Sequence, residues 1–461
     1  MTMTWKNEDR TVNGLIEQLR HHVGGRVLEA SDAEYDAERR AWHLLVDQQP
    51  VAIVQVADLA DIQATVRVAA EYGVPVITQP GGHGASKATA GPGILLRTGD
   101  LTGIDIGAET VRVEAGVKWR DLNAALDGTG LSSLPGSSGD VSVIGYLLGG
   151  GYSWFGRKYG LAANQVRSFG LVDADGNFQH VAADTDPDLF WALRGGGGEF
   201  GVVTSVELEL TPCDTIHGGR MLWHYEHARP VLRAFASVTS SAPDELTVWA
   251  WLLNVPDAPF VPAPMRGRWM VAIDVAFLGD MSGMDELIAP IRAAGTPFAD
   301  ALGELPLAEV GRISQEPEDP MPAVGRAGLL TAFGDQAIDA LLDAVDAGLP
   351  LVGAIEVRHL GGAFAQSGKA DGAGGPVSEP YFLLTGGAAL APELEQAVDT
   401  ALLGLLDAVK PSLSDRVPVN FAIEEPIERL YPAETLSRLR EIKKRVDPAA
   451  LIRGNHPLDQ Q

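Results

Sequence analysis

A short buried strand that runs directly into a glycine-rich loop is the feature that most constrains this chain. Residues 74–77 are apolar and lie between Gly73 and Pro80, as expected of a buried strand. The loop that follows, Gln79–Ala85, carries one histidine, His83, among its glycines. Such a loop leaves backbone amides uncovered by side chains, which suits a phosphate or pyrophosphate. Taken alone, the stretch is more often a plain turn with a surface histidine, so its meaning depends on the rest of the chain.

The segments before this loop complete a strand–helix–strand unit. Residues 50–56 have the pattern of a strand, and residues 58–72 that of a helix with one apolar face. Together with strand 74–77 they form a βαβ unit, which arrives at the glycine loop. Further downstream the pattern predicts strands at 93–97, 110–115, 166–173 and 202–210, and helices at 119–126 and 186–193.

A second glycine-rich stretch covers residues 134–152, where six of nineteen positions are glycine. A stretch of this length with so few side chains predicts backbone that packs against something flat or extended. A third run, at 195–201, contains a formal G-x-G-x-x-G. A dinucleotide fingerprint needs a helix directly after its glycines, whereas here a β-branched strand follows, so we reject this match.

Composition excludes several classes of partner. The formal net charge of -26 argues against nucleic acid or an anionic membrane surface, but not against one small anionic ligand. The single cysteine, Cys213, excludes an internal disulfide framework and a cysteine-only zinc site, and no metal site is predicted. The N-terminal residues lack a signal-peptide pattern, and no apolar run approaches the roughly 18 residues of a membrane span. We therefore expect a cytoplasmic protein.

Beyond Pro212 the residue pattern of the chain changes. Long alternating segments at 220–225, 246–253, 268–276 and 351–359, with intervening helices near 283–294 and 335–347, predict an antiparallel sheet with helices on one face. Trp249 and Trp251 must share one side of their strand. We expect these indoles to pack against the helices, with a substrate platform as the less favoured alternative.

Seven short motifs stand out along the chain, namely Gly81-Gly82-His83, Pro135-Gly136, Gly149–Tyr152, Arg157–Gly160, Asp188–Gly195, Phe200–Val203 and Lys444–Pro448. Together these motifs resemble the FAD-linked oxidoreductases of the vanillyl-alcohol oxidase superfamily, in the berberine-bridge-enzyme-like branch. The resemblance runs from about residue 25 to residue 457 and is dense between residues 50 and 212. It implies an α+β fold: a two-lobed PCMH-type FAD-binding domain built from two α/β subdomains, plus a substrate domain with an antiparallel sheet covered by helices. The implied boundaries are 1–212 for the FAD-binding domain (core about 46–212), 213–411 for the substrate domain, and 412–461 for a tail that returns to the FAD-binding domain.

The resemblance also implies the cofactor site. The pyrophosphate would lie on Gln79, Pro80, Gly81, Gly82, His83, Gly84 and Ala85, and the adenine end on Gly201, Val202 and Val203. The ribityl chain and isoalloxazine would lie along Pro135, Gly136, Ser137, Ser138, Val141, Ser142, Gly145, Tyr146, Gly149, Gly150 and Tyr152. Asn420 and Asn455 would join from the tail. The family histidine that matches His83 bonds covalently to the 8α-methyl carbon of the flavin and raises its potential.

Three departures from the family pattern bear on the chemistry. Ser138 stands where many relatives carry a second flavin-linking cysteine, so we expect a single covalent link. Pro418 stands where a tail tyrosine often serves as catalytic base, so tyrosine-based proton chemistry does not carry over. Glu199 replaces the asparagine common in the third glycine run.

Candidate bases must therefore come from elsewhere. Tyr146 and Tyr152 lie in the second glycine stretch, although Tyr146 fits a cofactor contact equally well. Glu356, Arg358 and His359 lie on a strand that lines the substrate cavity in relatives. Strand alternation puts Glu356 and Arg358 on one face and His359 on the other, so at most one set faces the ring. For His359, a core or surface histidine without catalytic role is an equal alternative.

The function that the resemblance implies is an FAD oxidase. It would take a hydride from a small molecule (a sugar, alcohol, amine or natural-product intermediate) and pass the electrons to O2, giving hydrogen peroxide. Val141 occupies the position that guards oxygen access in the family, and a valine there predicts an oxidase. A dehydrogenase with another acceptor, and a flavoprotein with a non-redox binding or cyclase role, remain alternatives. The sequence leaves the substrate and the oligomeric state open.

Overall fold

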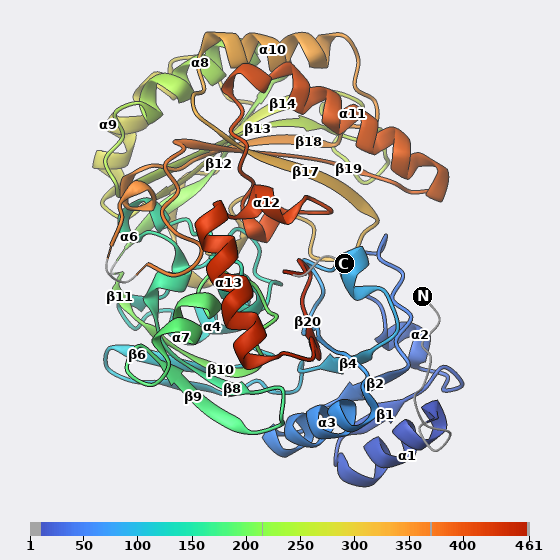
Figure 1. Cartoon of the computed structure of the whole chain (residues 1–461). Helices are drawn as coiled ribbons and strands as arrows, with labels where there is room; N and C mark the ends of the chain where they lie inside the picture. The colour runs from blue at the N-terminus through green and yellow to red at the C-terminus, as the bar shows by residue number, and fades with distance from the viewer. Residues whose placement is uncertain (1–10, 214, 369–370, 459–461) are drawn as a thin grey trace.

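The computed structural model describes residues 11–213, 215–368 and 371–458, and it contains three principal sheets. Two five-stranded sheets make up the lower half of the molecule in Figure 1, and an eight-stranded sheet under a layer of helices makes up the upper half. The mixture of helices and sheets confirms the predicted α+β class. Among the described residues, no helix is both long and apolar enough to cross a membrane.

The first sheet has the order β1-β2-β4-β3-β20 and carries the first glycine loop at the end of β3. Its bounds are β1 (Arg26–Leu28), β2 (Ala52–Gln55), β3 (Val76–Thr78), β4 (Ile94–Arg97) and β20 (Ile452–Arg453). β2, β4, β3 and β20 are parallel, and β20 shows that the tail returns to this sheet. α1 (Val12–His22) and α3 (Leu59–Tyr72) bury their apolar faces against it. The predicted strand–helix–strand unit is confirmed, with α3 capped by Asp58 at its start and by Gly73 at φ +67° at its end.

The second sheet is antiparallel, in the order β5-β6-β10-β8-β9. Its strands are β5 (Ile104–Ile106), β6 (Thr110–Glu114), β8 (Val166–Val172), β9 (Phe178–Ala182) and β10 (Val202–Glu209). The helices of this half include α4 (Trp119–Leu126), α5 (Val143–Leu148) and α7 (Pro187–Leu193). The tail helix α13 (Ala433–Val446) lies beside α7, and the ion pair between Arg445 and Asp186 joins the two segments.

The third sheet has the order β15-β12-β14-β13-β18-β19-β17, and β16 also pairs with β12. Its long strands are β12 (Ile216–His224), β13 (Leu246–Asn254), β14 (Trp269–Phe277), β17 (Ala323–Leu330), β18 (Ala354–His359) and β19 (Tyr381–Ala388). Helices α8 (Ala228–Thr239), α9 (Met281–Arg292), α10 (Asp335–Asp346) and α11 (Glu395–Ala408) cover its outer face (Figure 1). The predicted antiparallel sheet with helices on one face is confirmed. The shorter elements are α2 (Tyr35–Glu38), β7 (Leu131–Ser132), α6 (Gly156–Tyr159), β11 (Thr211–Pro212), β15 (Ala299–Asp300), β16 (Gly303–Leu305) and α12 (Ile427–Leu430).

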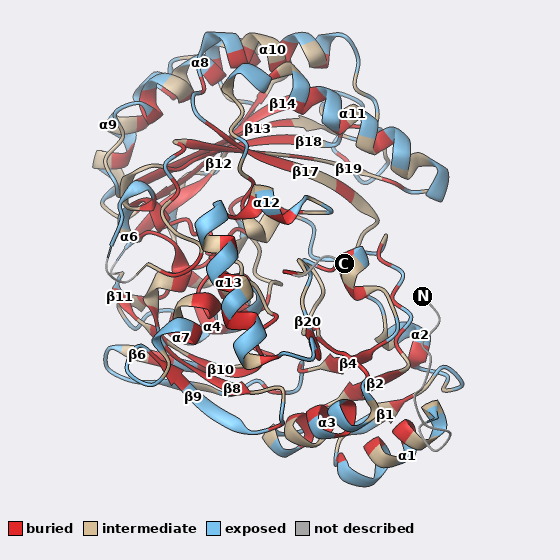
Figure 2. Ribbon diagram, viewed as in Figure 1, coloured by how far each residue is buried: buried red, intermediate tan, exposed pale blue. Residues whose placement is uncertain are grey.

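The strands of the third sheet are buried over most of their length (Figure 2), but the two faces of the sheet carry different side chains. On β13, Val248, Ala250 and Leu252 pack with the helices of the outer face. Trp249 and Trp251 therefore point to the opposite, inner face, which faces the lower half of the molecule. Trp249 stacks there on Trp154, with ring centroids 3.4 Å apart. The expectation that these indoles pack against the helices was wrong. Strand alternation places both indoles on one face of the sheet, but it does not determine which face the helices cover.

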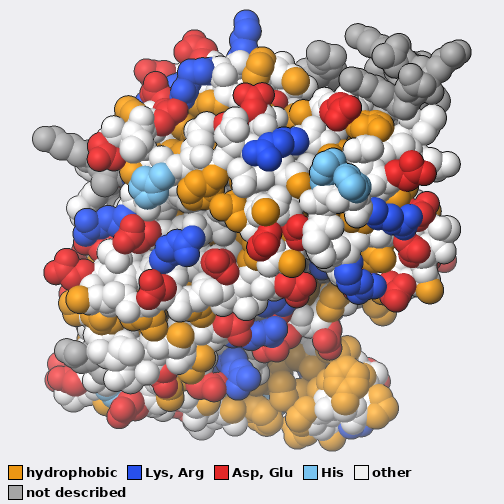
Figure 3. Space-filling view, turned by 90° about the horizontal axis from the view of Figure 1, so that it is seen from below, with side chains coloured by type: hydrophobic (Ala, Val, Ile, Leu, Met, Phe, Trp, Pro, Cys, Tyr) orange, Lys and Arg blue, Asp and Glu red, His pale blue; other side chains and the backbone are white. Residues whose placement is uncertain are grey.

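The face of the molecule seen in Figure 3 carries charges of both signs in close mixture. On the face viewed from below, acidic and basic side chains are interspersed, with no large area of one sign (Figure 3). The formal net charge of -26 is thus not gathered into one acidic field on this face. The site described next lies between the halves, where the inner face of the third sheet meets the glycine-rich stretches.

Candidate active site

The first glycine loop contains successive backbone amides that donate no hydrogen bond to the described residues. The carbonyls of Gly81 and Gly82 accept hydrogen bonds from the amides of Trp42 (3.0 Å) and His43 (3.3 Å), which fixes the loop from one side. Within the described part of the chain, the amides of residues 81–84 donate no hydrogen bond. At Gly82, with φ +84°, a Cβ would lie 2.8 Å from the Cα of Ala41, so only glycine fits. Four successive donors on a braced loop form a site for an anion.

His83 is held on two sides. Its imidazole stacks on the indole of Trp42, with centroids 4.4 Å apart and planes inclined by 15°. Its Nε2 lies 3.2 Å from Oδ2 of Asp140. The other oxygen of Asp140, Oδ1, accepts from Lys118 (2.5 Å) and pairs with Arg120 (3.1 Å). Burial alone would raise the pKa of Asp140, but the hydrogen bonds from His83 and Lys118 prevail and lower it to about 2.

The second glycine stretch is pinned from the tail by Asn420. The Nδ2 of Asn420 donates to the carbonyl of Tyr146 (2.9 Å), and its Oδ1 accepts from the amide of Gly151 (2.9 Å). At Gly151, with φ +80°, a Cβ would lie 2.5 Å from the ring of Tyr146. The Tyr146 hydroxyl donates to the carbonyl of Leu134 (3.3 Å). Asn420 therefore contacts the loop that was predicted to lie along the flavin, and it fixes the backbone of that loop.

Gly201 begins the chain segment that enters β10, and the residues before it bind the tail. The carboxylate of Glu199 accepts from the amides of Gly454 (3.2 Å) and Leu458 (2.9 Å). Glu199, which stands where an asparagine is common in the family that the sequence resembles, thus binds the tail of the chain. It places Asn455 beside the first glycine loop, where Ser86 donates through Oγ to the Asn455 carbonyl (2.6 Å).

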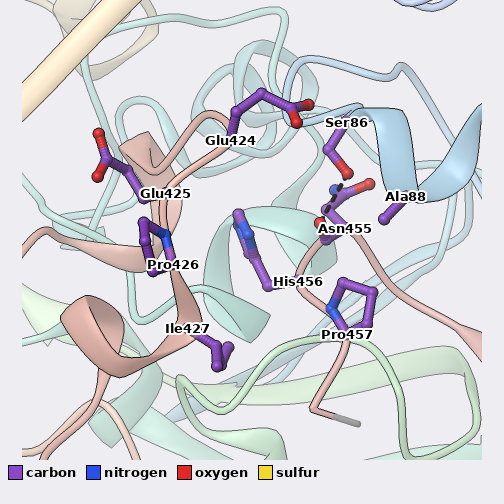
Figure 4. A pocket seen from close by; sticks show the side chains of 9 residues that line it. All are labelled: Ser86, Ala88, Glu424, Glu425, Pro426, Ile427, Asn455, His456 and Pro457. Atoms are coloured by element: carbon purple, nitrogen blue, oxygen red, sulfur yellow. Dashed lines mark hydrogen bonds between the residues drawn. The ribbon is translucent and has the colours of Figure 1, made fainter. Parts of the chain in front are cut away.

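A cavity of about 240 Å³ opens at this junction of loop and tail. Figure 4 shows the side chains of His456 and Glu424 on the tail segments beside Ser86 and Asn455. Burial lowers the pKa of His456 to about 4. Sequence reasoning identified Asn455 but missed His456, although the two residues are adjacent. The full lining is Ser86, Ala88, Glu424, Glu425, Pro426, Ile427, Asn455, His456 and Pro457.

The inner face of the third sheet presents a buried ion pair to the second glycine stretch. Arg358 donates to both oxygens of Glu356 (2.7 and 3.0 Å) and to Oγ of Ser137 (3.2 Å). Its guanidinium lies 4.0 Å from the ring centroid of Trp249 and pairs with Glu316 (3.3 Å). Burial raises the pKa of Glu356 to about 8, against the opposing effect of Arg358.

A second buried carboxylate, Asp274 on β14, extends this polar layer. It accepts two hydrogen bonds from Arg220 (2.6 and 2.7 Å), one from Nε1 of Trp251 (2.7 Å) and one from Ser314 (2.8 Å). Sequence reasoning missed both Asp274 and Arg220. A signal was present, because Asp274 is the one charged residue in the otherwise apolar strand 269–277.

His359, on the same strand as Glu356, lies on the outer face. Its Nε2 accepts from Nη1 of Arg157 (2.8 Å), and its ring lies near that of Tyr381. Burial, together with the positive charge of Arg157, lowers the pKa of His359 to about 2. The structure thus brings Glu356 and Arg358 to the glycine stretch and leaves His359 in the helix-covered layer.

The remaining candidate catalytic residues, Tyr146, Tyr152 and Val141, lie in the second glycine stretch. Tyr152 is surrounded by the rings of Phe364, Phe382 and Phe421. Burial raises the pKa of Tyr146 and of Tyr152, so neither hydroxyl ionises readily. Val141 is partly buried beside the same core.

These features fit a flavin dinucleotide. The first loop offers amides to a pyrophosphate, and the second offers glycine backbone on which a flat ring could lie. Three buried polar atoms in the same part of the chain, Thr78 Oγ1, Trp119 Nε1 and Trp154 Nε1, have no hydrogen-bond partner among the described residues. No cluster of three or more His, Cys, Asp or Glu in the described ranges is placed to hold a metal ion.

Comparison with known proteins agrees with this assignment. Residues 50–182 match the family model described as an FAD binding domain. The chain is 27% identical over 455 residues to (R)-6-hydroxynicotine oxidase from Paenarthrobacter nicotinovorans, covering 95% of this chain and 97% of that protein.

Solved structures share the whole fold. BBE-like protein 1 from Physcomitrella patens superposes with a TM-score of 0.83 at 20% identity, covering 97% of this chain and 100% of that one. Berberine bridge enzyme from Eschscholzia californica gives 0.82 at 18% identity, covering 97% and 99%. From the matched domain and the full-length relative, this protein is an FAD-linked oxidoreductase with an FAD binding domain over residues 50–182, and it shares the fold of the berberine bridge enzyme structures.

Proposed function

We propose that this protein is an oxidase that removes a hydride from a C–H bond next to nitrogen or oxygen in a small molecule and passes the electrons to O2, giving hydrogen peroxide. The observation that carries the proposal is the buried Glu356–Arg358 pair. It stands on the inner face of the third sheet and contacts Ser137 of the second glycine stretch. A carboxylate in that position can accept the O–H or N–H proton of a substrate whose C–H bond faces the ring.

The chain's own residues divide the work. The amides of residues 81–84 would bind the pyrophosphate, and the backbone of residues 135–152 would support the ring system. FAD, when bound, supplies the two-electron acceptor for the hydride. Glu356 accepts the substrate proton, and Arg358 holds the Glu356 carboxylate in place and keeps it from turning away.

We further propose that FAD is held by one covalent bond, from His83. Ser138 cannot supply a second link, because a serine hydroxyl is too weak a nucleophile for it. On a denaturing gel, the wild-type protein should show a flavin-fluorescent band after acid treatment. His83→Ala should lose the band while still binding FAD without a covalent link, and Ser138→Ala should keep it. A flavin-free wild-type band would contradict the covalent claim and leave the fold unaffected.

Val141 supports O2 as the acceptor, since a small residue at this position accompanies oxidases in the family that the chain resembles. The relative named as an oxidase supports the same choice. Its name also justifies including cyclic amines in a substrate panel, beside sugars, other alcohols and natural-product intermediates.

The deciding experiment is anaerobic mixing of the purified protein with the substrate panel, followed by air. Bleaching of the flavin absorbance without oxygen, and rapid recolouring in air, are expected. Bleaching with slow recolouring would instead indicate a dehydrogenase with another acceptor. Failure of every substrate in a broad panel to bleach the flavin would favour a non-redox role and contradict the proposal.

A further inference from the structure

The contacts of His83 and Asp140 distinguish the two nitrogens of the histidine ring. Nε2 is directed at Oδ2 of Asp140 (3.2 Å), whereas Nδ1 makes no hydrogen bond among the described residues. The Trp42 indole covers one face of the ring and fixes its plane. Asp140 itself immediately precedes Val141 in the second glycine stretch, so this contact joins the two loops predicted to hold FAD.

We propose that Asp140 is a positioning residue for covalent flavin attachment: it holds the His83 proton on Nε2 and leaves the lone pair of Nδ1 to bond the flavin methyl carbon. The proposal rests on the covalent link proposed above. In a neutral imidazole one nitrogen is a donor and the other an acceptor, and the partner of one decides the role of the other. A carboxylate facing Nε2 therefore selects the form in which Nδ1 is the nucleophile.

The surroundings of Asp140 keep it an acceptor. Lys118 and Arg120 both bind Oδ1, so Oδ2 remains for His83 and the carboxylate stays ionised. The Oγ of Ser138, two residues away, accepts a hydrogen bond from the backbone amide of Asp140 (3.4 Å) and thereby supports the turn that aims the Asp140 side chain. As Nδ1 forms its bond, positive charge develops on the ring, and Oδ2 lies where it can stabilise that charge.

The attachment reaction balances with dioxygen as the two-electron acceptor. An Nδ1–C bond forms to the methyl carbon while one C–H bond of that carbon breaks. One hydrogen from the methyl carbon and one from the imidazole are lost overall, and their two electrons and two protons convert O2 to hydrogen peroxide. The ring system of the cofactor is oxidised before and after attachment.

The test is a time course of attachment. Full-length protein produced without flavin is mixed with FAD in air, and acid-stable flavin fluorescence is measured against time. Asp140→Asn should slow attachment by about 10- to 100-fold, as is typical when the partner that orients a reactive histidine is removed. Asp140→Glu should restore part of the rate, since it keeps a carboxylate. Asp121→Asn, which removes the same charge from an exposed neighbouring position, should attach FAD at the wild-type rate.

Two further readouts separate the possible failures. Absorbance before acid treatment reports FAD bound without a covalent link, which Asp140→Asn should retain. The wild-type flavinyl-histidine, released by proteolysis, should match the synthetic Nδ1 isomer by chromatography, a measurement that needs no variant. An Nε2 isomer, or attachment in Asp140→Asn at the wild-type rate, would overturn the role of Asp140 and leave the covalent link standing. Absence of acid-stable flavin from the wild-type protein would overturn both proposals.

Discussion

The glycine-rich stretches and the inner face of the third sheet meet at one site but contribute different atoms to it. Residues 79–85 and 135–152 offer backbone amides and uncovered backbone, and a Cβ at Gly82, Gly149 or Gly151 would lie within 3 Å of a neighbouring atom. The inner face offers side chains instead, with Glu356, Arg358 and Asp274 buried among indole and phenyl rings. The difference supports the division of labour proposed above, in which the first region would bind the cofactor and the second would act on the substrate.

The largest expected effect comes from removing the base while leaving the glycine stretches intact. Glu356→Gln should lower kcat by about 10²- to 10⁴-fold, the usual contribution of a positioned general base. The variant should still bind FAD, because the cofactor-binding backbone is unchanged. Steady-state kinetics and the flavin absorbance check the two halves of this prediction. A variant that keeps kcat within about twofold would remove Glu356 from the proposed mechanism.

A substitution in the second glycine stretch tests the region that offers backbone instead of side chains. Gly151→Ala places a Cβ 2.5 Å from the ring of Tyr146 at φ +80°, which should lower the free energy of unfolding by about 2–4 kcal/mol. FAD occupancy should fall with it, because the loop that supports the ring must move. Denaturant unfolding and flavin content are the measurements.

Gly404 provides the matched control for this glycine. It lies inside α11, and no atom outside its own helix backbone and chain neighbours lies within 4 Å of the place that an alanine Cβ would take. Gly404→Ala should therefore raise stability by about 0.5–1 kcal/mol and leave FAD occupancy unchanged. Equal effects of the two substitutions would show that the second glycine stretch has no special packing requirement.

Val141 lies within the second glycine stretch, and its substitution should separate two steps of turnover. Val141→Leu should slow reoxidation by air by about tenfold, an increase of about 1.4 kcal/mol in that barrier. Anaerobic reduction by substrate should remain nearly unchanged. Stopped-flow absorbance resolves both steps, and equal slowing of the two would mean that Val141 only packs the loop.

The smallest kinetic effect is expected from substitution of His359, which lies on the outer face of β18, the strand that also carries Glu356. His359→Leu should cost about 1–3 kcal/mol of stability, because a buried donor of Arg157 loses its acceptor. It should not change the pH dependence of flavin reduction. Since folding lowers the pKa of His359 to about 2, the unfolded chain binds the proton more strongly, and stability is lost as the pH falls below about 6.5. Unfolding curves at pH 5 and 7 should show a smaller acid-induced loss for His359→Leu than for the wild-type protein.

The same two regions explain what could be predicted from the sequence. The glycine stretches are local features, so their composition and position in the chain predicted where the uncovered backbone of the candidate cofactor site lies. The inner face arises from register between distant strands: Trp251 lies opposite Ala272 on β14 and Glu356 on β18. Alternation predicted that Glu356 and Arg358 share a face, but not that Asp274 and Arg220 join them or that the tryptophans accompany them. Trp42 and Asp140 were missed for the same reason, because each meets His83 only after folding.

The most direct test of this division of labour is the pH dependence of anaerobic flavin reduction by a substrate. Because burial raises the pKa of Glu356 to about 8 and the base must be ionised, the wild-type rate should rise as the pH increases through about 8. Glu356→Gln should lose this rise while keeping its flavin, and His359→Leu should retain it. The same rise in Glu356→Gln, or its loss in His359→Leu, would contradict the assignment of substrate chemistry to the inner face.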